Sequence, residues 1–141
     1  MFFAVVGMAM AMCLTGCGEP SLNTYVRRYQ QQLPVDLGEG SKLTTCGIVD
    51  NYLEFEMTND EQVFALDDED ALMVFDLMSA YLKQDFMQEE AIQELLGACK
   101  KDAKGFRIMM QGERSGARKA LVDFTPEELL ANDSIPNTDN E

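Results

Sequence analysis

The segment YLEFEM at residues 52–57 decides the fold class, because two kinds of side chain alternate along it. Its Leu, Phe and Met fall on one side of an extended chain, and its Tyr and two Glu fall on the other, which is the pattern of a half-buried strand. Residues 42–49 are rich in Thr, Ile and Val and precede this strand across Asp50-Asn51, a pair typical of tight turns. The two runs therefore predict a β-hairpin.

A second hairpin is predicted near the end of the chain. Residues 105–111 and 118–124 have the composition of strands and are joined by GERSGA at residues 112–117. Alternation along the two strands predicts the following buried set: Phe106, Ile108, Met110, Ala120, Val122 and Phe124.

Helical periodicity occupies most of the remaining chain. Apolar residues recur at helical spacing over residues 22–33, and Pro34 ends that helix. Two further helices are expected, at residues 71–82 and 87–101. Residues 125–128 (TPEE) form a capping box with Pro at the first helical position, so a short helix is expected to run from there to about Ala131.

These elements predict one α+β domain over residues 22–131. The expected architecture is a four-stranded antiparallel sheet, made of the two hairpins, with helices packed on one face. About 125 residues after a cleaved leader are enough for one core and no second one. Residues 132–141 are expected to form a disordered acidic tail.

The helix expected at residues 71–82 is apolar almost all the way round, with Asp76 and Ser79 as its polar residues. A helix that rests on a sheet with its other side in water shows only an apolar stripe, so we expect this one to be covered on more than one side. Helix 22–33 covers it within the chain in the interpretation that we favour, because that helix also has an apolar face. The alternative is a second molecule, which would make the protein a dimer or a docking module.

The chain is strongly acidic, with a formal net charge of −14. From Asp50 to Glu94 there are fourteen acidic residues and one basic residue, Lys83. Such a surface repels phosphates, so nucleic acid is not expected as a partner. We interpret this surface as solvated charge, and the alternative is a docking face for a cationic partner or Ca²⁺. The absence of His excludes Ser-His-Asp and Cys-His catalysis.

The first seventeen residues predict export. Residues 2–14 are apolar or small and cover only about 20 Å as a helix, so they are typical of a signal peptide and too short for a membrane span. Leu14-Thr15-Gly16-Cys17 follows and resembles the lipobox of bacterial lipoproteins. One departure is that residues 1–4 contain no Lys or Arg, so we expect that the natural start lies upstream or differs from Met1.

The lipobox resemblance implies cleavage before Cys17 and attachment of diacylglycerol to its thiol, followed by acylation of the new amino group. Residues 1–16 are then the signal peptide and residues 17–21 a lipidated linker, and the partner of Cys17 is membrane lipid. Gly18, which stands where some lipoproteins have Asp, resembles the outer-membrane type. The expected location is thus the bacterial cell envelope, anchored by lipid to the outer membrane.

The exported part also resembles a group of small, uncharacterised envelope proteins. The likeness spans about 100 residues and is carried by Gln32-Leu33-Pro34, Cys99 and Gly105-Phe106. That group has no established activity to transfer to this chain.

Cys46 and Cys99 are expected to form a disulfide. They are the cysteines that are left after Cys17 and Cys13 of the signal segment are set aside, and export places them in an oxidising compartment. The alternative is a pair of buried free thiols.

Three groups of side chains are candidates for metal binding or catalysis. Residues 67–70 (DDED) offer Ca²⁺ ligands, but their spacing is not that of an EF-hand loop, and acidic residues at a helix start are explained by capping. Glu54 and Glu56 form a carboxylate pair on a polar strand face, with nothing expected nearby to shape a pocket or shift a pKa. Methionines on the helices are expected to pack in the core rather than to bind copper; they are Met73, Met78 and Met87.

We therefore expect no catalytic residue, no metal and no cofactor. The expected function is a membrane-anchored envelope lipoprotein that acts by contact with a partner protein or an envelope component rather than by catalysis. Two alternatives stay open: an inhibitor or immunity-type protein that uses its acidic face, and an enzyme with an unconventional carboxylate site.

Overall fold

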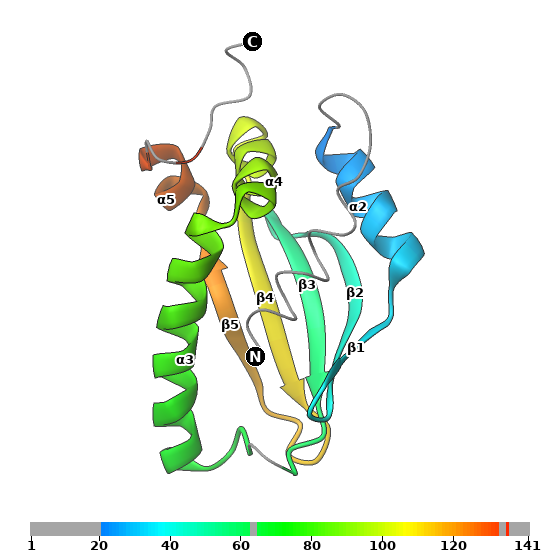
Figure 1. Ribbon diagram of the computed structural model, residues 1–141, viewed down its shortest axis with the longest axis vertical. Helices are drawn as coiled ribbons and strands as arrows, with labels where there is room; N and C mark the ends of the chain where they lie inside the picture. Colours follow the sequence, from blue (N-terminus) through cyan, green and yellow to red (C-terminus); the bar gives the residue numbers. More distant parts are fainter. Residues whose placement is uncertain (1–20, 63–64, 133–134, 136–141) are drawn as a thin grey trace.

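In the computed structural model, helices cover one face of a mixed five-stranded sheet (Figure 1). The structure describes residues 21–62, 65–132 and 135, and within these ranges the strand order is β1-β2-β3-β4-β5. The predicted signal peptide at residues 1–16 and the lipid attachment site at Cys17 lie outside the described residues. The α+β class is confirmed, but the predicted sheet of four antiparallel strands is not the one observed.

The first hairpin is present as predicted. Strands β2 (Ser41–Val49) and β3 (Tyr52–Asn59) pair antiparallel across Asp50 and Asn51, both of which have positive φ, as a two-residue turn of the type I′ kind requires. The apolar residues of β3, namely Leu53, Phe55 and Met57, are fully buried on the helix side of the sheet.

The second hairpin is also confirmed, with one correction to its buried set. Strands β4 (Gly105–Gly112) and β5 (Arg118–Phe124) pair antiparallel, but the register slips between Ile108 and Met109. The slip leaves Leu121 as an extra residue in β5, and Leu121 is fully buried. Ala120, which alternation assigned to the core, is only half-buried.

The sheet differs from the predicted one in two respects. Helices α3 (Glu69–Gln88) and α4 (Glu90–Lys101) connect β3 to β4, and a crossover of this kind brings the chain back to pair parallel with the strand that it left. The sequence also did not indicate β1 (Val35–Gly38), which adds a fifth, edge strand to β2. Four residues are too few for a recognisable alternation.

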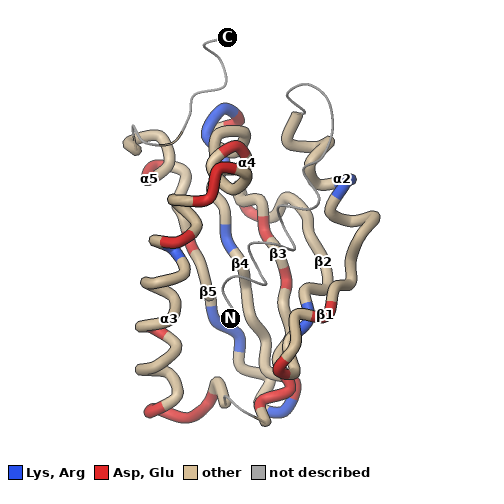
Figure 2. The backbone as a smooth tube through the Cα atoms, viewed as in Figure 1, with Lys and Arg blue, Asp and Glu red and all other residues tan. Residues whose placement is uncertain are grey.

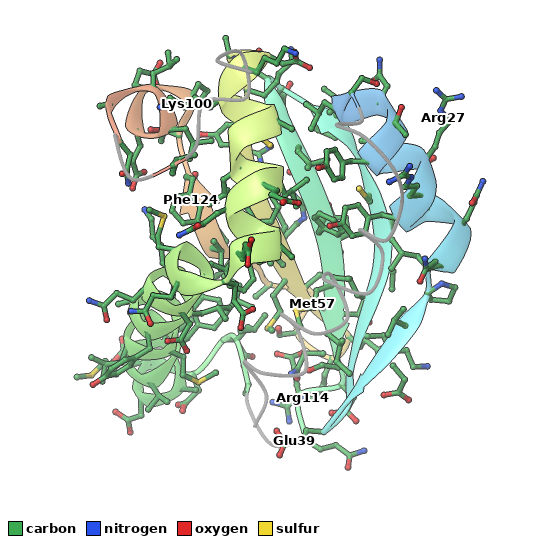
Figure 3. All side chains as sticks on the ribbon, turned by 45° about the horizontal axis from the view of Figure 1, so that its top comes forward. Arg27, Glu39, Met57, Lys100, Arg114 and Phe124 are labelled. Atoms are coloured by element: carbon green, nitrogen blue, oxygen red, sulfur yellow. The ribbon has the colours of Figure 1, made fainter. Side chains whose placement is uncertain are left out.

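Helix α2 (Leu22–Gln32) has the predicted position and packs on β2. Its Tyr29 ring also lies 4.9 Å from the ring of Phe55 in β3, centroid to centroid. Helix α5 (Pro126–Ala131) has the predicted capping box. Figure 3 shows Met57 and Phe124 between the sheet and the helices, and Arg27 pointing away from α2 into solvent.

Two residues of the predicted tail, Asn132 and Ile135, belong to the described part of the chain. Ile135 is buried, and Lys100 Nζ donates hydrogen bonds to the carbonyl oxygens of Asn132 and Ile135 at 3.2 and 3.5 Å. Burial of the one aliphatic side chain in the tail removes its apolar surface from water. The other residues of the predicted tail lie outside the described part of the chain.

Candidate interaction surface

Helix α3 is fixed to the sheet by one of its sides. Phe75, Leu82 and Phe86 project from this side and are fully buried. Ser79 Oγ donates a hydrogen bond of 2.5 Å to the carbonyl oxygen of Leu121 in β5. Because these contacts orient the helix, they also determine which side of it faces solvent.

The opposite side of α3 exposes a row of apolar side chains. We call this row the apolar stripe and define it as Met73, Val74, Leu77, Ala80 and Tyr81. Met73, Leu77 and Tyr81 are 69%, 65% and 64% exposed, and Val74 is 50% exposed. Their spacing of four residues aligns them along about 12 Å of the helix surface. Soluble monomers rarely leave contiguous apolar surface of this kind in water.

The expectation that helix 22–33 covers this helix is wrong. Helix α2 lies on β2 and beside α4, whereas α3 packs on β5 at the opposite edge of the sheet (Figure 1). The sheet is too wide for one helix to reach the other, and the described residues contain no other segment that covers the apolar stripe. The expectation that Met73 packs in the core is also wrong, because Met73 is exposed. Met78 is half-buried, and Met87 is half-buried and packs against the core.

The residues that border the apolar stripe are acidic, and Figure 2 shows the acidic positions of α3 as red segments of its backbone. Asp70 lies at its beginning, and Asp76 and Asp85 are exposed on its two flanks. The one basic residue of α3, Lys83, is 2.6 Å from Glu128 of α5 in an ion pair. The surface around the stripe thus presents carboxylates to any partner.

The carboxylate pair of β3 is neutralised by arginines. Arg107 Nε is 2.5 Å from Glu54, and Arg118 contacts both Glu54 and Glu56. The Arg107 guanidinium also stacks on Tyr52, 4.2 Å from the ring centroid, so Glu54 is only 4% exposed. The hydrogen bond to Glu56 raises the pKa of Arg118 further above its ordinary value. These ion pairs stabilise the outer sheet face and leave neither carboxylate free to act on a substrate.

Residues 67–70 open α3 as the capping interpretation predicts. Asp68 is the N-cap, and its carboxylate accepts a hydrogen bond from Ala71 N at 3.1 Å. Glu69 and Asp70 occupy the first turn, where negative charge interacts favourably with the helix dipole. In the described ranges no cluster of three or more His, Cys, Asp or Glu is arranged to hold a metal ion.

Cys46 of β2 and Cys99 of α4 are both buried, and no disulfide joins them in the structure. Burial raises the pKa of Cys99 strongly, with further contributions from Asp102 and Cys46. The Cys99 thiol is therefore protonated at neutral pH and is a poor nucleophile.

The disulfide between Cys46 and Cys99 remains a prediction. In an oxidising compartment the bond would close a loop of about 53 residues, which adds roughly 4 kcal/mol to the free energy of unfolding on the chain-entropy model. Mass spectrometry after alkylation of the unreduced, denatured protein measures this. We expect neither residue to be alkylated until a reductant is added, and complete alkylation without reductant would rule the bond out.

A buried carboxylate that the sequence did not indicate joins two loops. Glu61 follows β3 and is 4% exposed. It accepts hydrogen bonds from the backbone N–H groups of Leu66, Arg114 and Ser115, and from the Ser115 hydroxyl, at 2.6 to 2.9 Å. Its contacts connect the loop before α3 to the turn between β4 and β5. This is a structural role, because each oxygen is occupied by protein donors.

No helix among the described residues is both long and apolar enough to cross a bilayer. The chain matches no protein-family model, and neither a curated protein nor a solved structure is significantly similar to it. Its function therefore has to be inferred from its own residues.

Proposed function

We propose that this chain is a lipoprotein of the bacterial cell envelope, anchored to the outer membrane through acylated Cys17, and that it acts by binding a partner protein. The anchor is supported by the apolar leader and by Leu14-Thr15-Gly16-Cys17. The linker that follows has about four residues and spans at most about 15 Å, so the domain sits close to the bilayer.

The observation that carries the binding role is the uncovered apolar stripe of α3. Four of its side chains remain 50–69% exposed although α3 is firmly packed on its other side; they are Met73, Val74, Leu77 and Tyr81. Exposed apolar surface lowers solubility unless a partner covers it, so the exposed stripe favours a docking site. The catalytic alternative is weaker, because arginines hold both Glu54 and Glu56.

Photo-crosslinking in cells that make the protein naturally tests this role. A photoreactive amino acid at Leu77 is expected to yield a discrete crosslinked protein in the membrane fraction, because Leu77 lies at the centre of the stripe. The matched control is Gln31, an exposed position on α2. Identical crosslinks from Leu77 and Gln31, or none from either, would contradict a docking role for α3.

A further inference from the structure

We propose that the apolar stripe of α3 docks an amphipathic helix of a partner protein, one that carries Lys or Arg beside its apolar face. The inference rests on the proposed binding function and specifies the chemistry of the partner. Two properties of the surface lead to it, namely the shape of the stripe and the charge of its rim.

The shape of the stripe fits a helix. Met73, Leu77 and Tyr81 follow one another at intervals of four residues and so form a single ridge along α3. Such a ridge packs into the groove between the side-chain rows of a second helix, over about two helical turns. Helix α3 borders the sheet on one side and solvent on the other (Figure 1), so a partner helix can lie along it without displacing any described segment.

The charge of the rim selects a cationic partner. Four acidic residues lie on α3, at its first turn and on both flanks of the stripe, against one lysine. That lysine, Lys83, is already paired with Glu128. Asp76 has its own partner, Lys119 Nζ at 3.8 Å, but its side chain remains 72% exposed. Carboxylates that surround an apolar centre attract Lys and Arg on a partner and speed its association.

The same charges disfavour the two other occupants of an apolar helix face. A second copy of the chain would bring an identical acidic rim against this one, and each copy has a net charge of −14. A bilayer with anionic lipids would repel the acidic residues of α3, because such surfaces attract Lys and Arg instead. A cationic amphipathic helix would bury the apolar stripe with its own apolar face and place its Lys or Arg beside the acidic rim.

A binding measurement with a designed probe tests the proposal. The full chain is placed in zwitterionic nanodiscs and titrated against a fluorescent 18-residue peptide with Leu on one face and Lys on both flanks of it. Fluorescence anisotropy compares the wild type with Leu77→Glu, which removes the centre of the stripe, and with Asp76→Lys/Asp85→Lys, which reverses the rim. Because all three proteins are in identical nanodiscs, binding of the peptide to lipid cancels.

We expect the wild type to bind the Lys-flanked peptide at least tenfold more tightly than either variant does, with affinity that falls as salt increases. A peptide with Glu in place of Lys should show no preference for the wild type. Equal binding by all three proteins overturns the proposal, as does a wild type that light scattering finds to be a dimer dissociated by Leu77→Glu. Leu77-dependent binding to anionic vesicles overturns it as well.

These outcomes separate the proposal from the binding function on which it rests. A crosslink at Leu77 together with equal peptide binding leaves the docking role standing and refutes the cationic helix. Both variants alter exposed side chains, so their thermal unfolding should match that of the wild type. If Leu77→Glu unfolds at a lower temperature than the wild type, Asp76→Lys/Asp85→Lys still tests the role of the acidic rim, because the apolar stripe is intact in that variant.

Discussion

Replacement of Glu61 by Ala is expected to lower the free energy of unfolding by about 3 to 4 kcal/mol. Three backbone N–H groups, those of Leu66, Arg114 and Ser115, donate to this buried carboxylate and lose their acceptor in the variant. Hydrogen bonds to a charged group contribute about 1.5 to 3 kcal/mol each, and buried donors left without an acceptor add to the loss. The two loops that Glu61 joins should also become more mobile.

Urea unfolding followed by circular dichroism measures this effect. Glu113→Ala is the matched control, because Glu113 is an exposed carboxylate in the neighbouring turn. Its stability should stay within about 0.5 kcal/mol of that of the wild type. A loss below about 1 kcal/mol for Glu61→Ala would mean that the carboxylate does not hold these loops together.

The dependence on pH gives a second readout of the same group. Burial alone would raise the pKa of Glu61, but the hydrogen bonds from Ser115, Leu66 and Arg114 outweigh it and lower the pKa from 4.5 to about 2. Since the folded-state pKa is the lower one, the stabilisation is fully present above pH 4.5 and is lost as the pH falls towards 2. The stability difference between the wild type and Glu61→Gln should therefore be largest at pH 6 and shrink steadily below pH 4.5.

Elements governed by local rules are the ones that could be predicted from the sequence. Helix α2 ends one residue before the predicted Leu33, because Pro34 acts on its immediate neighbours. Helix α5 begins at Pro126, as the capping box requires, and the first hairpin turns at Asp50 and Asn51. Each of these depends on a few consecutive residues and not on the rest of the fold.

Features that depend on distant residues could not be predicted. Strands β3 and β4 pair in parallel because two helices intervene between them, and hairpin rules carry no information about pairing between hairpins. The ion pair of Glu54 with Arg107 joins residues 53 positions apart. The sequence placed Glu54 on a polar strand face and gave no sign of this partner. The backbone N–H groups that donate to Glu61 are present in every residue type except Pro, so the sequence does not indicate this site.

The packing of α3 also depends on distant residues and could not be predicted from the sequence. Its apolar composition predicted that more than one side would be covered, and the cover was assigned to helix 22–33. That helix packs on the other edge of the sheet, and the apolar stripe is exposed. The apolar pattern of a helix does not identify the segment that packs on it. The tertiary structure shows instead that Leu77 is exposed among the described residues.

Replacement of Cys17 by Ala is expected to release the protein from the membrane completely. In the proposed mature form at least two acyl chains join Cys17 to the bilayer, and each buried CH₂ contributes about 0.8 kcal/mol, so attachment through two chains is effectively permanent. The acidic domain has no comparable affinity for an anionic bilayer of its own. Cys13→Ala is the matched control, because Cys13 lies within the proposed signal peptide and carries no lipid.

Labelling with radioactive palmitate, followed by separation of membrane and soluble fractions, tests the lipid anchor most directly. The wild type and Cys13→Ala are expected to incorporate label and to pellet with the membranes even after a high-salt wash. Cys17→Ala is expected to carry no label and to appear as soluble protein or unprocessed precursor. A wild-type protein that takes up no palmitate, or a Cys17→Ala variant that is labelled as strongly as the wild type, would contradict the account.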